Sequence, residues 1–145
     1  MTNRIQELTV DKTWRNEQDA WNNRSNYFVE MHNRDDRKAQ VTEFLSFLKD
    51  ENLLPPKGGC TLDIGCGVCD YALGLAREGH KATGIDLSDG MIRGAKQLAE
   101  AEGLDLSLYI APWSDETRRE LKWDKTFDLT YSIFCPIMFD VENIR

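Results

Sequence analysis

The sequence predicts an α/β fold in which helices cover both faces of a parallel sheet. Short apolar segments alternate with amphipathic segments from residue 60 to residue 134, which is the order of parallel strands joined by crossover helices. Gly79 and Gly103 stand where two of the amphipathic segments end. A length of 145 residues, with 41% hydrophobic and 30% charged residues, indicates one globular domain.

Residues 1–55 are predicted to be an N-terminal helical segment. The pattern is helical from residue 14 to about residue 50, with a break near residues 33–36. After the break, four apolar side chains have the i, i+3, i+4, i+7 spacing of one helix face: Val41, Phe44, Leu45 and Leu48. Two prolines and two glycines at residues 55–59 then end the helix.

Residues 56–145 are predicted to hold the sheet. Four strands are expected, at residues 60–64, 81–85, 106–111 and 127–134. The helices between them are expected at residues 70–78, between the N-cap Ser88 and Gly103, and at residues 115–121. Ligands of open parallel sheets bind beyond the carboxyl ends of the strands, so the turn after residue 64 is the predicted site.

This turn has two glycines where a strand passes sharply into a helix. Gly65 can take a strained φ angle, and Gly67 lets a ligand approach the backbone closely. Asp86 ends the next strand, 21 residues after Gly65. The arrangement is typical of two ligand classes, dinucleotides and the adenosine of S-adenosylmethionine.

The acidic residues of the turn favour the second class. A dinucleotide fingerprint requires glycine at position 70, where this chain has Asp70, and a carboxylate there repels a pyrophosphate at a helix N-terminus. S-adenosylmethionine instead carries a cationic sulfonium and an ammonium group, which Asp63 and Asp70 can bind or screen. Asp86 would accept hydrogen bonds from both ribose hydroxyls.

Three stretches carry a resemblance to a known family. LDIGCGVCDYALGLA, followed by GIDLSDGMI, resembles the first and second motifs of the class I S-adenosylmethionine-dependent methyltransferases, and FDLTYSIF resembles their fourth strand. The resemblance implies a Rossmann-like three-layer α/β/α sandwich, with S-adenosylhomocysteine as the product of the cofactor. It also implies that the glycine turn approaches the methionine end, that Asp86 holds the ribose, and that Leu87 and Met91 flank the adenine.

Two further contacts are predicted. Trp113 follows the third strand, where such proteins often carry an acidic residue, and we expect it to stack on the adenine. The aromatic residues of the N-terminal segment have two possible roles. They either pack between helices or form a lid over the cofactor, as in the small-molecule methyltransferases that the segment resembles. Tyr27 is the predicted pocket contact. The predicted cofactor-binding residues are Tyr27, Asp63, Gly65, Cys66, Gly67, Asp70, Asp86, Leu87, Met91 and Trp113.

The chain departs from the family pattern at two places. Cys69 stands where many members have a third glycine, so the helix is expected to start slightly farther from the ligand. Members usually continue through three more strands after the position of Arg145. We therefore expect an incomplete chain, truncated after the fourth strand and inactive by itself, that self-associates through the uncompleted sheet edge.

Composition and motif counts exclude several other classes. Cys66 and Cys69 form a single CxxC without the second pair or the histidine spacing of a zinc site, so no metal is expected. A net charge of -7 argues against nucleic acid as a partner. Nothing in the sequence resembles a secretory signal or a membrane span, so a cytoplasmic location is expected.

The predicted function is S-adenosylmethionine-dependent methyl transfer to a small-molecule acceptor. An apolar stretch at residues 134–139 is expected to form part of the acceptor wall. No residue identifies itself as catalytic, because the sulfonium is already activated and a base is needed only for some acceptors. The alternatives are a non-catalytic S-adenosylmethionine-binding or interaction protein and a nicotinamide-binding oxidoreductase, the latter disfavoured by Asp70.

Overall fold

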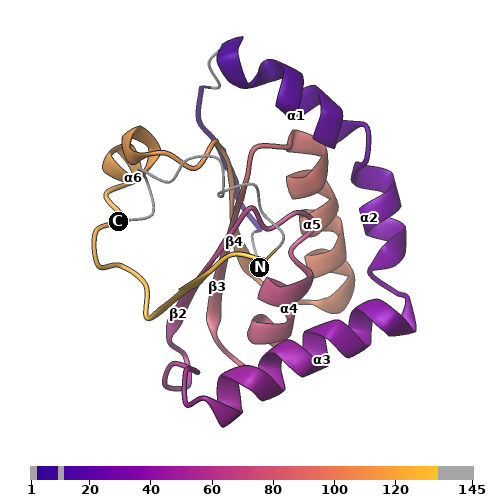
Figure 1. Cartoon of the computed structure of the whole chain (residues 1–145), viewed down its shortest axis with the longest axis vertical. Helices are drawn as coiled ribbons and strands as arrows, with labels where there is room; N and C mark the ends of the chain where they lie inside the picture. Colours follow the sequence, from indigo (N-terminus) through magenta and orange to yellow (C-terminus); the bar gives the residue numbers. More distant parts are fainter. Residues whose placement is uncertain (1–2, 10–11, 134–145) are drawn as a thin grey trace.

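The computed structural model describes residues 3–9 and 12–133 (Figure 1). Its elements follow the predicted alternation, which confirms the α/β fold with a parallel sheet. In chain order they are β1 (Ile5–Glu7), the 3-10 helix η1 (Lys12–Trp14), α1 (Arg15–Asn22), α2 (Ser25–Met31), α3 (Asp35–Asp50), β2 (Cys60–Ile64), α4 (Asp70–Arg77), β3 (Lys81–Asp86), α5 (Asp89–Glu102), β4 (Leu106–Ile110), α6 (Asp115–Leu121) and β5 (Leu129–Tyr131).

The described sheet has five parallel strands in the order β1-β4-β3-β2-β5, one more than predicted. The additional strand is β1, which lies inside the segment predicted to be helical. Asn3 fixes it, because its side chain donates to Leu104 O at 3.1 Å and accepts from the Leu106 N–H at 2.7 Å. A strand of three residues is too short to leave a periodic signal in the sequence.

The strand order reverses at β2, and this reversal positions the site. From β2 the chain adds β3 and then β4 on one side, and it returns to add β5 on the other. Connections on the two sides of β2 therefore diverge at the carboxyl ends of the strands, which opens a crevice there. β5 is shorter than the predicted strand at residues 127–134, and residues 134–139 of the predicted acceptor wall lie outside the described residues.

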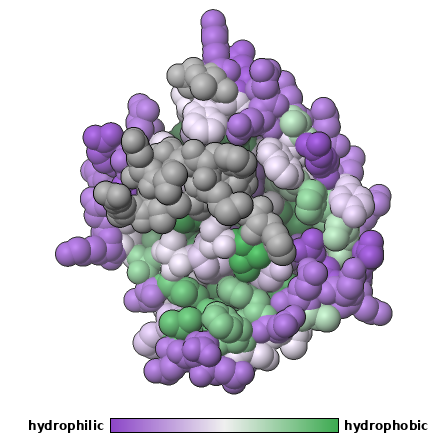
Figure 2. All heavy atoms as spheres, in the orientation of Figure 1, coloured by the Kyte–Doolittle hydropathy of each residue, from purple (hydrophilic) through white to green (hydrophobic). Residues whose placement is uncertain are grey.

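Two apolar clusters cover the two faces of the sheet. On one face α4 and α5 bury Val68, Ala72, Leu73, Ile92, Ala95, Leu106, Leu108 and Ile110. On the other face, near α6, lie Leu8, Leu62, Ile64, Ile85 and Ala111, with Trp123 and Phe127 packed against them. Figure 1 shows α6 on one side of the sheet and the other helices on the opposite side. In Figure 2, hydrophobic residues gather in the lower central part of the viewed face, and hydrophilic residues lie around its edge.

The N-terminal helices form an additional layer outside α4 and α5. The predicted break near residues 33–36 is present between α2 and α3, and a second break separates α1 from α2. Trp21, Phe28 and Val29 pack against the cluster under α5. The contact is close, since a Cβ at Gly94 would lie 2.6 Å from Val29 Cγ2. Within the described ranges, no helix combines the length and apolarity that crossing a membrane requires.

Local capping explains where the helices of the sheet domain begin and end. Ser88 Oγ accepts from the Met91 N–H at 3.1 Å, which confirms Ser88 as the N-cap of α5, and Gly103 closes that helix with a φ of 66°. Ser114 Oγ accepts from the Thr117 N–H at 3.1 Å and starts α6 in the same way. These caps fix the first residues of α5 and α6, which begin at the carboxyl edge of the sheet.

Candidate functional site

The glycine turn between β2 and α4 rests on the end of β3. The backbone N–H groups of Gly65 and Cys66 both donate to Ile85 O, at 2.8 and 3.0 Å. Gly65 and Gly67 have φ angles of 67° and 55°, in the left-handed region that glycine adopts without strain. The turn is therefore held in a fixed shape, with its backbone facing the crevice.

Asp86 lies beside this turn and is bound to it. Its Oδ2 accepts from the Gly67 N–H and its Oδ1 from the Ser88 N–H, each at 2.8 Å. Burial raises the pKa of the Asp86 carboxyl, while these two backbone donors lower it. Both oxygens keep lone pairs for further donors, which is the arrangement required to bind a pair of hydroxyls.

Asp63 is the buried carboxylate of the site. Its side chain is at the end of β2, the residue is 2% exposed, and its Oδ2 has no hydrogen-bond partner among the described residues. Burial raises the pKa of Asp63 well above its ordinary value, although the nearby Tyr131 hydroxyl lowers it. A buried carboxylate oxygen without a partner is costly, and a cationic group placed against it would stabilise the charged form of the carboxyl.

A cavity of about 670 Å³ opens at these residues. Nine of the ten predicted site residues line it: Asp63, Gly65, Cys66, Gly67, Asp70, Asp86, Leu87, Met91 and Trp113. The tenth, Tyr27, does not. Its side chain is 56% exposed and packs edge-on against Phe28, with ring centroids 5.6 Å apart. The turn of α2 directs Phe28 to the cavity instead, so the pocket contact predicted for Tyr27 was wrong by one residue.

The opposite wall of the cavity comes from the N-terminal helices. Its lining residues there are Trp14, Glu17, Trp21, Phe28, Arg37 and Gln40. Asn22 attaches α1 to the start of α5, because its Oδ1 accepts from Ser88 Oγ at 2.6 Å and from the Gly90 N–H at 2.9 Å. Gln18 Nε2 donates to Leu87 O at 3.1 Å. These polar contacts could not be predicted from the sequence, because a lone amide in a helix gives no signal of its partner.

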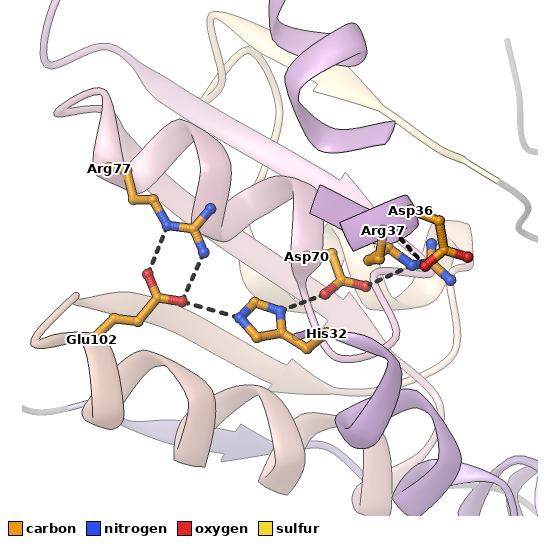
Figure 3. A network of polar contacts seen from close by, with 6 residues as sticks. All are labelled: His32, Asp36, Arg37, Asp70, Arg77 and Glu102. Carbon is orange, nitrogen blue, oxygen red and sulfur yellow. Dashed lines mark hydrogen bonds and ion pairs between the residues drawn. The ribbon is translucent and has the colours of Figure 1, made fainter. Parts of the chain in front are cut away.

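Asp70 is engaged by cationic side chains (Figure 3). His32 Nδ1 lies 2.6 Å from its Oδ1, and Arg37 Nε lies 3.6 Å from its Oδ2. This corrects the charge argument from the sequence, since the Asp70 carboxylate is neutralised by the protein itself. Asp63 is the carboxylate that remains for a cationic ligand.

Cys69 takes the left-handed conformation in which the family pattern often has glycine. Its φ is 66°, and the residue is completely buried. Gly84 on β3 provides the space, because a Cβ there would collide with Cys69 Sγ and lie 2.8 Å from Cys66 Sγ. Burial raises the pKa of the Cys66 thiol well above its ordinary value. The two thiols therefore fill a gap beneath the turn as neutral groups.

Comparison with known proteins decides the family. A family model described as "Methyltransferase domain" matches residues 61–145, which include the glycine turn, Asp86 and β3 to β5. The chain belongs to this family. The predicted family, the Rossmann-like fold and S-adenosylmethionine as the cofactor are thereby confirmed.

Individual relatives of this methyltransferase domain are more distant. A protein of Geobacillus sp. (strain WCH70) assigned as a methyltransferase is 36% identical over 74 residues, covering 51% of this chain and 28% of that protein. The 23S rRNA (uracil(1939)-C(5))-methyltransferase of Shewanella amazonensis is 39% identical over 64 residues, covering 43% of this chain and 14% of that protein. The chain thus spans less than a third of the length of these two curated relatives.

A solved structure gives a further match. It was reported with the conversion of a disulfide bond into a thioacetal group during echinomycin biosynthesis. It has 34% sequence identity and a TM-score of 0.51, covering 60% of this chain and 34% of that one.

The exclusion of nucleic acid from the net charge was wrong. Besides the Shewanella amazonensis enzyme, similar proteins from Shewanella halifaxensis, Hahella chejuensis and Pyrococcus abyssi are named as 23S rRNA uracil methyltransferases. Net charge sums over a whole chain, whereas a nucleic acid is bound by a local surface or by other parts of a longer protein. The charge of this domain therefore does not decide the acceptor.

Proposed function

We propose that this chain binds S-adenosylmethionine in the cavity between the glycine turn and α1 to α3, and that the protein to which it belongs transfers the methyl group to a small-molecule acceptor. The observation that carries the proposal is Asp63, a buried carboxylate whose Oδ2 has no partner among the described residues and which lines the same cavity as Asp86. The cofactor is long and cationic at its methionine end and carries two ribose hydroxyls. The two carboxylates complement these two groups.

Different residues of the cavity would bind different parts of the cofactor. Asp86 would hold the ribose, because its two oxygens are fixed by backbone donors and still have free lone pairs. Asp63 would bind the cationic end, which would stabilise the ionised form of this buried carboxyl. Leu87, Met91 and Trp113 would enclose the adenine with apolar surface.

For methyl transfer, the protein must orient the cofactor and the acceptor and exclude water from them. When bound, S-adenosylmethionine supplies a methyl group on a cationic sulfur, already activated for in-line displacement. Trp14, Trp21 and Phe28 cover the cavity with aromatic surface and would exclude water from the acceptor. A general base is required only for an acceptor that must lose a proton.

A small-molecule acceptor is supported by the cover of N-terminal helices and by one similar structure. The helices line one wall of a cavity of about 670 Å³, a volume within the range of small-molecule sites. The structure that is 34% identical was reported with the conversion of a disulfide bond into a thioacetal group, which is chemistry on sulfur atoms. RNA is the second candidate acceptor, because several relatives are named for methylation of 23S rRNA. The cytoplasmic location expected from the sequence is kept as part of the proposal.

Calorimetric titration of the chain with S-adenosylhomocysteine tests cofactor binding, with NADH as the control ligand. We expect heat and one-site saturation with S-adenosylhomocysteine and none with NADH. No heat with S-adenosylhomocysteine would sink the proposal, and binding of NADH alone would favour an oxidoreductase.

A transfer assay then tests the acceptor. The chain is incubated with a cell extract and methyl-labelled S-adenosylmethionine, and acid-soluble metabolites are separated from acid-precipitated RNA. Label in the soluble fraction supports the small-molecule acceptor. Label in the precipitated fraction that disappears after nuclease treatment would show that RNA, and not a small molecule, is the acceptor.

A further inference from the structure

We infer that His32 is a positioning residue for the cofactor site: as an imidazolium it joins Asp70 to Glu102 and holds α2 against the start of α4. The inference rests on the proposed function, because it assigns His32 a role in keeping the cavity closed over S-adenosylmethionine. His32 does not line the cavity itself. It acts through Asp70, which does, and through α2, which carries Phe28 into the wall.

Both ring nitrogens of His32 face carboxylates (Figure 3). Nδ1 lies 2.6 Å from Asp70 Oδ1, and Nε2 lies 3.0 Å from Glu102 Oε1. A neutral imidazole has one N–H and would leave its bare nitrogen lone pair against the second carboxylate. Only the imidazolium donates to two ionised carboxylates, so the geometry favours the protonated ring.

Two arginines, one from α3 and one from α4, surround this pair of contacts. Arg37 of α3 faces Asp70 Oδ2 at 3.6 Å. Arg77 of α4 binds Glu102 with Nε 2.6 Å from Oε2 and Nη2 2.7 Å from Oε1. His32 is 7% exposed, so these are the charges that it meets in place of water. The hydrogen bond to Asp70 raises the pKa of His32, an effect that burial opposes and the bond to Glu102 reinforces.

The network therefore ties four helices together, and it reaches the cavity through Asp70 and Arg37, which line it. His32 follows α2, Asp70 begins α4, Glu102 ends α5, and Arg37 belongs to α3. Asp70 comes directly after Cys69 and three residues after Gly67, so its position fixes where the glycine turn enters the helix. Loss of the proton from His32 breaks one of its two bonds and loosens α2 from this framework. The affinity for the cofactor is then expected to fall as the pH rises.

The affinity for S-adenosylhomocysteine, measured by calorimetry from about pH 6 to about pH 9, tests the inference. For the wild-type chain we expect the dissociation constant to rise by about tenfold across this range, which corresponds to about 1.4 kcal/mol. His32→Gln is expected to bind weakly and without this pH dependence. Glu102→Gln keeps the ring and removes one carboxylate, so the midpoint is expected to move to lower pH.

His80→Gln is the matched control. His80 is the other histidine of the chain and is also buried, but it precedes β3 at the end of the sheet opposite the cavity. This variant is expected to keep the wild-type pH profile. Nitrogen chemical shifts of the His32 ring, assigned in the His80→Gln variant, are expected to show both nitrogens protonated at neutral pH with or without cofactor.

The outcomes separate this inference from the proposed function. Binding of S-adenosylhomocysteine with a flat pH profile, or a neutral His32 ring at neutral pH, would overturn the role of His32 and leave the proposed function standing. A wild-type profile in Glu102→Gln would also overturn it. Absence of binding at every pH would overturn both, because the positioning role presupposes the cofactor.

Discussion

The two walls of the cavity are built in different ways. The sheet wall, made of the glycine turn and the residues around Asp86, is continuous in sequence between residues 62 and 91 and is held by backbone hydrogen bonds to Ile85 O and to the Asp86 carboxylate. The helical wall of α1 to α3 is held by side chains, chiefly Asn22 and His32, that reach distant parts of the chain. Substitutions in the sheet wall should therefore remove contacts to the cofactor. Substitutions in the helical wall should instead change how closely α1 to α3 pack over the cavity.

The largest effect is expected at Asp86. Asp86→Ala removes the predicted ribose acceptor and should weaken S-adenosylhomocysteine binding by about 1.5 to 3 kcal/mol. Asp86 also accepts from the Gly67 and Ser88 N–H groups, so Asp86→Asn is the comparison variant: it keeps the shape and one acceptor oxygen but turns an NH2 group toward the other backbone donor. Calorimetry measures both, and an unchanged affinity in Asp86→Ala would refute the assignment.

Gly84→Ala tests the packing under the sheet wall. The new Cβ would collide with Cys69 Sγ and approach Cys66 Sγ, so we expect the free energy of unfolding to fall by about 1 to 3 kcal/mol, measured by urea denaturation. Adding Cys69→Gly removes the nearer sulfur and relaxes a left-handed residue, and it should recover part of this loss. Strictly additive effects of the two substitutions would contradict the proposed fit between Gly84 and Cys69.

Asn22→Ala breaks the attachment of the helical wall. It removes the acceptor of Ser88 Oγ and of the Gly90 N–H, and we expect a loss of about 1 kcal/mol in stability with a smaller loss in cofactor affinity than for Asp86→Ala. Asn26→Ala, at an exposed position of α2, is the control. Equal stability of the two variants in thermal unfolding would show that Asn22 does not hold α1.

The smallest effect is the pH dependence of stability due to His32. Its pKa is raised in the folded state, so its contribution is fully present below the unfolded value of 6.5 and is lost as the pH rises through the folded value. The raised pKa of buried Asp63 acts in the same direction, starting at lower pH. The difference between wild type and His32→Gln in urea denaturation isolates His32, and this difference should shrink as the pH rises above neutral. A constant difference would mean that the ring does not titrate there.

Local sequence signals predicted most of the sheet wall. The strand and helix bounds, the N-cap Ser88 and the two glycines of the turn follow from periodicity and from the φ angles that a turn requires, which are properties of a few neighbouring residues. Nine of the ten predicted site residues were brought together for the same reason, since they lie on two consecutive strand–turn–helix units and at the end of a third strand. The prediction for Tyr27 was wrong because the rotation of α2 against α5 decides which of two adjacent residues faces the cavity, and the sequence does not reveal this rotation.

By itself the sequence determined the fold class, through the alternation of segments over residues 60–134, and the family and the cofactor, through motifs that lie within about 30 consecutive residues. Only the tertiary structure decided which groups meet across the chain: the pairing of β1 through Asn3 and Leu104, 101 residues apart, and the contacts of Asn22 and His32 over 66 and 38 residues. It also decided the electrostatics of the site. The Asp70 carboxylate is neutralised by His32 and Arg37, whereas Asp63 is left buried, since charge balance depends on neighbours in space rather than in sequence.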